Sequence, residues 1–230
     1  MGLPSGVHHL AVATADIKTQ IAFFSEVLGM ELVALYWMHG VDGAWHGFLK
    51  LNDASYLAFV ETPEIAKIER TLGVTHAGNG GNPCAGGTMQ HVALNVDTKD
   101  ELLALRDRIR AHGVTVLGPI DHGMCWSMYF AGPEDLSLEI ATSERAIDGR
   151  AWIDPDVVAR AGITAEELER YRAPAPFASE NGAVPQPEFD PEKPWMRGYE
   201  EQSYRKVVAL PDAVVFERSS QPDPPVAVDE

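Results

Sequence analysis

The chain has 230 residues, of which 45% are apolar and 23% charged, and this composition is typical of a globular protein with a packed core. The formal net charge of −16 argues against a nucleic-acid or anionic-membrane partner, which would need clusters of Lys and Arg. Two cysteines, Cys84 and Cys125, are too few for a disulfide framework and suit reduced thiols. We find no signal-peptide pattern and no run of roughly 20 apolar residues, so we expect a cytoplasmic protein without a membrane span.

Prolines divide the chain into two parts. Five of the sixteen prolines fall in residues 1–145 and eleven fall in residues 146–230. We therefore expect a packed domain over 1–145 and an extension over 146–230.

The packed part begins with a strand-like run that starts at His9. Asp16 is a suitable N-cap for a helix, and Gly29 suits the end of that helix. Apolar residues recur between them at helical spacing, at Ile17, Ile21, Phe24 and Leu28. Three further strand-like runs follow, near residues 30–38, 46–51 and 56–61.

The same order of elements is repeated from His91 onward. After a second strand-like run, Thr98 and Glu101 have the spacing of a capping box, and Gly113 suits the end of the helix. Strand-like runs follow near residues 114–118, 126–131 and 136–141. The sequence therefore predicts an α+β domain of two βαβββ modules, over about residues 6–62 and 88–142.

Period-two alternation in the strands sorts their side chains onto two faces. The large apolar residues share one face, while His9, His91 and Glu139 share the other, which suggests a cupped mixed sheet around a metal. Two histidines and one carboxylate suit Fe(II), and Mn(II) or Zn(II) could use similar ligands. Each histidine could instead be an ordinary sheet residue, but their equivalent places in the repeat favour a metal site.

A fourth protein ligand is not expected. The position in the first module that corresponds to Glu139 is Ala58. Glu61 is a rival ligand, but strand alternation directs it to the other face unless a bulge intervenes.

These features resemble the vicinal-oxygen-chelate superfamily, which includes glyoxalases, fosfomycin-resistance proteins, epimerases and type I extradiol ring-cleavage dioxygenases. The resemblance covers about residues 6–142, and the ligand positions of the family read His9, Ala58, His91 and Glu139. The segment with His122, Met128-Tyr129, Pro133 and Glu139 resembles the signature of the extradiol dioxygenases. It departs from that signature at Gly132 and at Asp135, and the second departure should alter the turn before the last strand.

The resemblance implies roles for three further residues. His122 and Tyr129 would stand beside the substrate and hydrogen-bond its oxygen. His76, about fifteen residues before His91, would act as an acid–base catalyst, as imidazoles can near neutral pH. Each has an ordinary alternative, because loop histidines are usually solvated and Tyr129 could simply be a strand aromatic.

The leading hypothesis is an Fe(II)-dependent extradiol dioxygenase that cleaves a catechol-type ring with O2. One alternative is a lyase, isomerase or transferase of the same fold that uses Zn(II) or Mn(II) without O2, and another is a metal-free protein that binds a small aromatic ligand. Four residues could line an aromatic pocket or belong to the core or an interface: Trp37, His39, Trp45 and Trp126.

The extension is predicted to contain short helices, one opened by Asp154-Pro155 and one from Thr164 to about Arg172. The remainder, 173–230, is rich in proline but carries scattered aromatics. We expect it to be an ordered arm that wraps its own domain or a partner subunit of a homo-oligomer.

Overall fold

The structure is a computed structural model that describes residues 4–179 and 182–227. Residue contacts divide the chain into one unit from Pro4 to Thr164 and a second that begins at Ala165. The segment 146–164, which we expected to open the extension, groups with the first unit. The two units are described separately.

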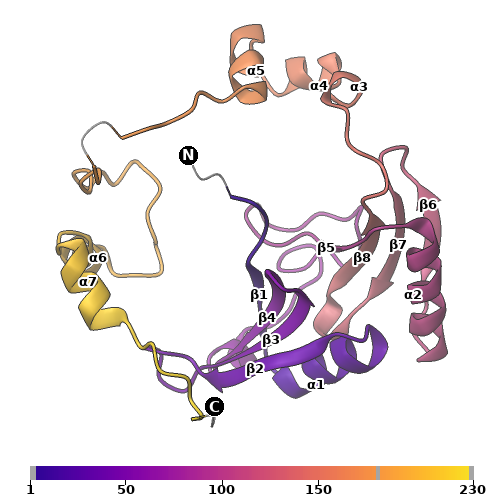
Figure 1. Ribbon diagram of the computed structural model, residues 1–230, viewed down its shortest axis with the longest axis horizontal. Coiled ribbons are helices and arrows are strands. Elements are labelled where there is room, and N and C mark those ends of the chain that lie inside the picture. The colour runs from indigo at the N-terminus through magenta and orange to yellow at the C-terminus, as the bar shows by residue number, and fades with distance from the viewer. Residues whose placement is uncertain (1–3, 180–181, 228–230) are drawn as a thin grey trace. The chain divides into compact units, whose positions relative to one another are not determined.

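The first unit holds two four-stranded sheets, with strand orders β1-β4-β3-β2 and β5-β8-β7-β6 (Figure 1). In each sheet the first strand of the module runs parallel to the last, and the other neighbours are antiparallel. The first module contains β1 (His9–Thr14), α1 (Ile17–Ala22), η1 (Phe23–Val27), β2 (Glu31–Trp37), β3 (Trp45–Asn52) and β4 (Ser55–Glu61). The second contains β5 (Val92–Val96), α2 (Lys99–Ala111), β6 (Leu117–Asp121), β7 (Trp126–Ala131), η3 (Pro133–Asp135) and β8 (Ser137–Thr142). The prediction of two βαβββ modules in an α+β fold is confirmed.

The ends of the two long helices follow from the residues predicted to cap them. The Asp16 carboxylate accepts from the backbone N–H of Thr19 at 3.0 Å, and Thr98 forms a complete capping box with Glu101. In the first module the helix continues from α1 into the π-helix η1. Gly29 and Gly113 follow the helices with φ of 81° and 79°, a conformation that favours glycine.

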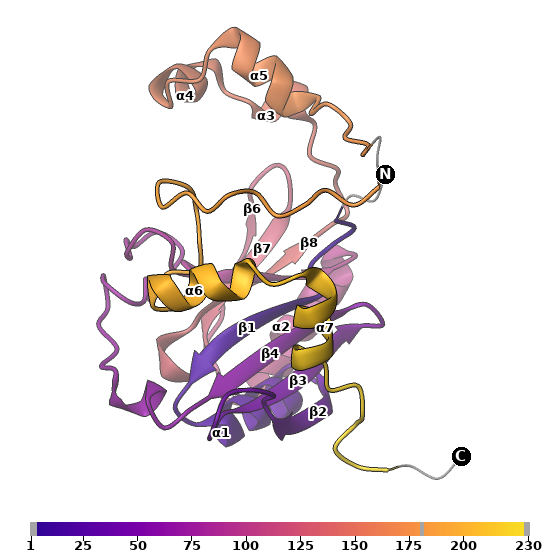
Figure 2. The ribbon, with the colours of Figure 1, turned by 90° about the vertical axis from the view of Figure 1, so that its left-hand side faces the viewer.

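One face of each sheet is covered by a helix. α1 packs on β3 and β4, and α2 packs on β5, β7 and β8. In Figure 2 the strands of the first sheet face the viewer and α1 lies behind them. The buried side chains of both modules form a single cluster that includes Phe24, Phe59, Leu102, Ile109, Met128 and Leu138. The candidate site residues lie on the opposite faces, on which neither α1 nor α2 packs.

The turn before β8 joins the second module to the first. Glu134 and Asp135 both adopt left-handed backbone angles, with φ of 57° and 61°, which are uncommon for residues other than glycine. The Glu134 carboxylate accepts from Thr14 Oγ1 at 2.5 Å and from the backbone N–H of Ala15 at 3.0 Å. Gln20 Nε2 donates to the same carboxylate at 2.9 Å. These contacts tie the strained turn to the start of α1.

One strand is displaced from its predicted position. We expected a strand at 114–118, but β6 spans Leu117–Asp121. Val114 and Val116 pack against the shared core before the pairing with β7 begins. Their apolar character therefore reflects burial in a connecting segment, which alternation alone does not distinguish from a strand.

The chain after β8 is helical in several short pieces. α3 (Gly149–Trp152) and α4 (Pro155–Arg160) belong to the first unit, and α4 is capped by Asp154 as expected. The second unit contains α5 (Ala165–Arg172), α6 (Glu201–Val208) and α7 (Asp212–Ser219), of which α6 and α7 were not predicted. Phe189, Trp195 and Tyr204 form a small aromatic cluster beside α6, with ring centroids 5.5 to 6.0 Å apart. Among the described helices, none has the length and apolar character needed to cross a membrane.

Candidate metal centre

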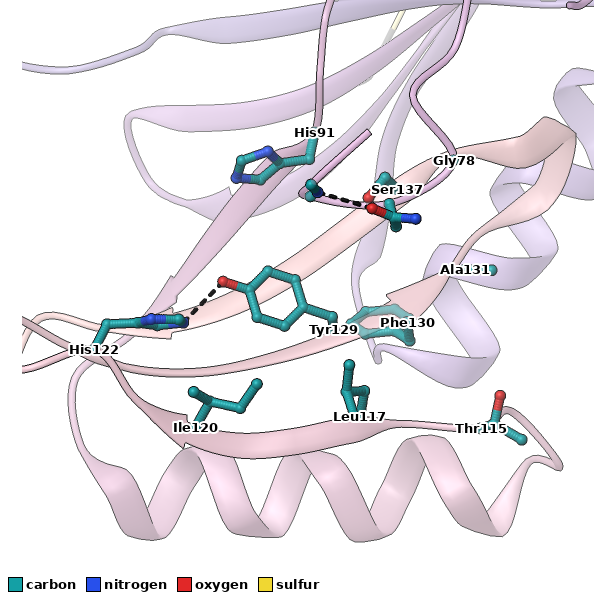
Figure 3. A pocket seen from close by; sticks show the side chains of 13 residues that line it. Gly78, His91, Thr115, Leu117, Ile120, His122, Tyr129, Phe130, Ala131 and Ser137 are labelled. Atoms are coloured by element: carbon teal, nitrogen blue, oxygen red, sulfur yellow. Dashed lines mark hydrogen bonds between the residues drawn. The ribbon is translucent and has the colours of Figure 1, made fainter. Parts of the chain in front are cut away.

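A cavity of about 560 Å³ opens on the uncovered face of the second module (Figure 3). Its walls come from β6, β7 and β8 and from the glycine-rich loop that precedes β5. The polar side chains that it collects include His91, His122, Tyr129 and Ser137. Three of the predicted site residues therefore line one cavity.

Two of the predicted metal ligands lie next to each other beside this cavity, which one of them, His91, lines. His91 directly precedes β5, and Glu139 lies on the adjacent strand β8, where Ala93 is its partner. The Nε2 atom of His91 is 3.1 Å from Oε2 of Glu139, and Glu139 is only 6% exposed. An imidazole and a buried carboxylate that converge in this way suit a divalent cation.

The imidazoles of His91 and His9 are each hydrogen-bonded by the residue that precedes them in the sequence. Nδ1 of His91 hydrogen-bonds Oε1 of Gln90, and Nδ1 of His9 hydrogen-bonds Nδ1 of His8 at 2.9 Å. In each module the residue before the candidate ligand thus contacts Nδ1, and Nε2 of His91 faces the Glu139 carboxylate. Ligand histidines in metalloproteins are usually held by such a second hydrogen bond, so the donor set fits a metal on this observation as well.

Tyr129 lies beside the His91–Glu139 pair. It is the cross-strand partner of Glu139, and its hydroxyl is 3.0 Å from Nε2 of His122, as Figure 3 shows. Burial, together with the negative charge of Glu139, raises the pKa of the Tyr129 phenol above its ordinary value. A protonated phenol can donate a hydrogen bond to an anionic oxygen in the cavity.

His9 lies apart from this group. The side chain is exposed on the open face of the first module, where its ring contacts are His8, His46 and Phe48. Across the described residues, no cluster of three or more His, Cys, Asp or Glu side chains could hold a metal within one chain. The structure thus brings two of the three predicted ligands together.

A family model for the glyoxalase/bleomycin resistance protein/dioxygenase superfamily matches residues 6–140, more than half of the chain. The chain belongs to this superfamily. The match covers both modules and stops within β8, so it includes every predicted site residue. It agrees with the resemblance to the vicinal-oxygen-chelate proteins seen in the sequence.

The chain is also similar to solved structures, of which three are named here. An integron cassette protein from the mobile metagenome of the Halifax Harbour sewage outfall is 23% identical, with a TM-score of 0.44, and covers 60% of this chain and 98% of its own. Lactoylglutathione lyase from Agrobacterium tumefaciens is 21% identical, with a TM-score of 0.42 and coverage of 65% and 97%. The fosfomycin resistance protein FosX from Listeria monocytogenes, complexed with Mn(II) and sulfate, is 17% identical, with a TM-score of 0.40 and coverage of 61% and 93%.

His76 lies outside the cavity of the second module. Its Nδ1 atom is 2.9 Å from Thr75 Oγ1, and the residue lines a different, smaller cavity together with Arg70 and Glu134. The structure therefore does not bring His76 to His122 and Tyr129, the partners that the resemblance implied. Its catalytic role stays a prediction.

The rival metal ligand and the tryptophans suggested as pocket residues have contacts elsewhere in the fold. Glu61 accepts from the backbone N–H of Ile17 at 2.8 Å, at the start of α1. Trp37 and Trp45 pack against each other edge to face, and Trp45 lies against the core. Trp126 also packs against the core, beneath the Lys99 ammonium, which is 3.6 Å from its ring centroid. None of these side chains lines the cavity that holds His91.

One residue of the open faces was missed by the sequence analysis. His46 on β3 is only 7% exposed, and its ring centroid is 6.1 Å from that of His9. Burial, and then the charge of His9, lower the pKa of the His46 imidazole, which favours its neutral form. The available signal was strand alternation, since His46, Phe48 and Lys50 share a parity on β3 and face the same side as His9.

Proposed function

We propose that this protein is an Fe(II)-dependent extradiol dioxygenase that cleaves a catechol-type ring with O2. The observation that carries the proposal is the hydrogen-bonded pair of Tyr129 and His122 beside the His91–Glu139 pair. His91, His122 and Tyr129 then line one cavity, and Glu139 is paired with His91 beside it. That combination suits a ligand that binds through adjacent oxygens.

The side chains of the cavity have distinct roles in this proposal. The Tyr129 hydroxyl donates a hydrogen bond to one oxygen of the bound catechol, and His122 holds the phenol in place through its Nε2 atom. Imidazoles also exchange protons near neutral pH, so His122 can take up a catechol proton. Iron, when bound, would supply the open coordination positions at which the substrate and O2 are held side by side.

The apolar part of the cavity suits a ring. Leu117 and Ile120 line it opposite His91 (Figure 3). Its volume of about 560 Å³ falls within the range of roughly 300–1,000 Å³ that is usual for small-molecule sites. A cavity with an apolar wall, and with no Asp, Glu, Lys or Arg among its described lining residues, favours an aromatic substrate over a highly charged one.

We further propose that the third ligand, His9, comes from a second copy of the chain. His9 lies on an exposed sheet face, away from His91 and Glu139 of its own chain. If the open face of the first module met the open face of the second module of another copy, His9 would join the other two ligands. Two-fold symmetry would make two equal centres in such a homodimer.

The test is metal analysis of the purified protein followed by anaerobic reconstitution and a catechol assay. Under this proposal, Fe(II)-loaded protein consumes O2 in proportion to catechol and gives a coloured ring-cleavage product. Tight stoichiometric Zn(II) or Mn(II) with no O2 uptake would contradict the dioxygenase and favour Lewis-acid chemistry. Retained binding of an aromatic ligand without any metal, unchanged in His9→Ala, would favour a binding protein.

A further inference from the structure

The turn that joins β6 to β7 carries His122. The backbone N–H of His122 donates to the carbonyl oxygen of Cys125 at 2.9 Å and closes the turn. Gly123 lies within it with φ of 81°, a conformation that favours glycine. The His122 side chain leaves this turn toward the cavity, where the Tyr129 hydroxyl is its partner (Figure 3). The place of the imidazole in the cavity therefore depends on the place of the turn.

The side chain of Arg145, which follows β8, binds this turn at two points. Its Nη1 atom donates to Oδ1 of Asp121 at 2.7 Å and to the carbonyl oxygen of Gly123 at 2.9 Å, and its Nη2 atom is 3.3 Å from Oδ2 of Asp121. The Gly123 N–H donates to the same Asp121 Oδ1 atom at 2.8 Å. One guanidinium thus connects the last residue of β6 with the backbone of the turn.

The contact between Arg145 and Asp121 suits positioning better than stabilisation of the fold. The hydrogen bond from Arg145, and then the one from the Gly123 N–H, lower the pKa of the Asp121 carboxyl, so the pair stays charged at neutral pH. The two side chains are 38% and 39% exposed, and exposed ion pairs contribute little to the free energy of unfolding. Two-point binding by a guanidinium does, however, fix the geometry of the groups that it joins.

The indole of Trp152 on α3 packs on the same turn. A Cβ atom added to Gly123 would lie 2.9 Å from Cη2 and 3.0 Å from Cζ2 of this ring, so the indole rests on the glycine backbone. Trp152 is nevertheless 45% exposed and is not a core residue. Among the described residues that line the cavity, neither Arg145 nor Trp152 is present. Both can therefore affect the cavity only through the turn.

The imidazole of His122 needs such support, because it is exposed. Within the part of the chain that the structure describes, its side-chain hydrogen-bond partner is the Tyr129 hydroxyl at 3.0 Å. The chain also connects the two halves of the site here, since β8 carries Glu139 and leads directly to Arg145. The strand that supplies a candidate ligand thus brings the arginine to the turn that carries the candidate acid–base residue.

We propose that Arg145 is a positioning residue, which holds the β6–β7 turn so that the imidazole of His122 faces the Tyr129 hydroxyl in the cavity. Trp152 packs on the turn and supports the same placement. The inference rests on the proposed function, because Arg145 would affect ring cleavage through His122. It also brings Trp152, which the sequence analysis placed in the extension, next to the site.

The first test measures kcat for catechol cleavage by Fe(II)-loaded variants. Arg145→Ala should lower kcat by about tenfold with unchanged iron content, because a catalytic group that is displaced loses its orientation. In a His122→Ala background the same substitution should have no further effect, since changes that act through one residue are not additive. Arg145→Lys should recover part of the loss, because a lysine can still pair with Asp121 but lacks the planar fork.

Two further variants control this measurement. Gly123→Ala would press a Cβ atom against the Trp152 indole and move the turn without touching Arg145, so it should also lower kcat, and again only while His122 is present. Arg150→Ala is the matched control, since Arg150 pairs with Asp148 at 2.6 Å within the same segment. It should behave like wild type.

The second test needs neither metal nor turnover. The ring signals of His122 are followed by NMR in metal-free protein with labelled histidine, and His122→Ala identifies them. In otherwise wild-type protein, Tyr129→Phe should shift these signals, because it removes the hydroxyl 3.0 Å from Nε2. In an Arg145→Ala background the shift should be much smaller, because the imidazole no longer faces the phenol.

The outcomes separate this inference from the proposed function. If Arg145→Ala lowers kcat equally with and without His122, the arginine does not act through that residue and the inference is overturned. It is also overturned if Arg145→Ala leaves both kcat and the response of the His122 signals as in wild type. If loaded wild type does not cleave catechol but the NMR response depends on Arg145, the proposed function fails and the positioning of His122 is supported.

Discussion

The Nε2 atom of His91, which directly precedes β5, lies 3.1 Å from Oε2 of Glu139 on the neighbouring strand β8. Parallel pairing of β5 with β8 fixes the spacing of the two backbones and so brings the two side chains close together. Gln90 then orients the imidazole through its Nδ1 atom. The corresponding contact of His8 with His9 in the first module shows that the repeat carries the orienting residue as well as the ligand.

The orienting residues should affect metal affinity without being ligands. We expect Gln90→Ala and His8→Ala each to weaken Fe(II) or Co(II) binding by about 10- to 100-fold, the usual range for partners of ligand histidines. Glu139→Gln should weaken it further, because a ligand itself is lost. Competitive titration with a chelator measures the metal affinity of all three variants. Equal affinity in wild type and Gln90→Ala would show that this hydrogen bond does not orient His91.

Tyr129 should contribute to turnover and not to metal binding. Tyr129→Phe removes the hydroxyl that lies 3.0 Å from His122 and keeps the ring in the cavity. We expect kcat for a catechol substrate to fall by roughly 10²- to 10³-fold, as for the loss of one donor to an anionic oxygen. Iron content should stay the same. A variant with wild-type kcat would remove the tyrosine from the proposed mechanism.

Glu134 should stabilise the domain in a pH-dependent way. Burial by itself would raise the pKa of its carboxyl, but the hydrogen bonds from Thr14, Gln20 and Ala15 and the charge of Arg70 together lower it. Since the pKa is lower in the folded state, the stabilisation is present above the ordinary value near 4.5 and is lost as the pH falls through the folded value.

Glu134→Gln tests this contribution. At pH 7 we expect the free energy of unfolding to fall by about 2 kcal/mol, the typical size for hydrogen bonds to a charged group. Below the folded pKa the variant and wild type should converge. Urea unfolding at several pH values measures both effects, with the exposed Glu31→Gln as control. A difference that stays constant down to pH 2 would contradict the linkage.

The sequence was sufficient for the fold because the signals were local and repeated. Capping by Asp16 and Thr98 and the glycines after the helices depend on contacts only a few residues apart, and each formed as predicted. The strand at 114–118 was misplaced because Val114 and Val116 are buried by distant residues. The helices α6 and α7 were not predicted, because we interpreted the high proline content of 173–230 as an extended arm and did not consider short helices between the prolines.

The candidate site could be predicted from the sequence only in part, because it also depends on contacts between distant residues. Alternation placed His91 and Glu139 on one face, and the repeat made His9 equivalent to His91. Neither pattern contains the angle between the two sheets, so the separation of His9 from its expected partners was not predictable. His76 was assigned by spacing from His91, and spacing along a glycine-rich loop does not determine which cavity a side chain enters.

Complementation between two inactive variants tests whether the centre is shared by two copies. His9→Ala retains His91 and Glu139, and His91→Ala retains His9. A mixed dimer would then hold one intact centre and one that lacks both histidines. If the variants are unfolded, mixed in equal amounts and refolded, half of the dimers are mixed, so about a quarter of wild-type metal content and activity should return.

Each variant refolded alone is the control and should stay inactive. Wild type carried through the same procedure gives the reference value. If all three ligands came from one chain, every chain in the mixture would lack one histidine, and no mixing could restore a centre. Recovery near a quarter therefore requires ligands from two copies, whereas the absence of recovery from protein that refolds as a dimer would contradict a centre shared between copies.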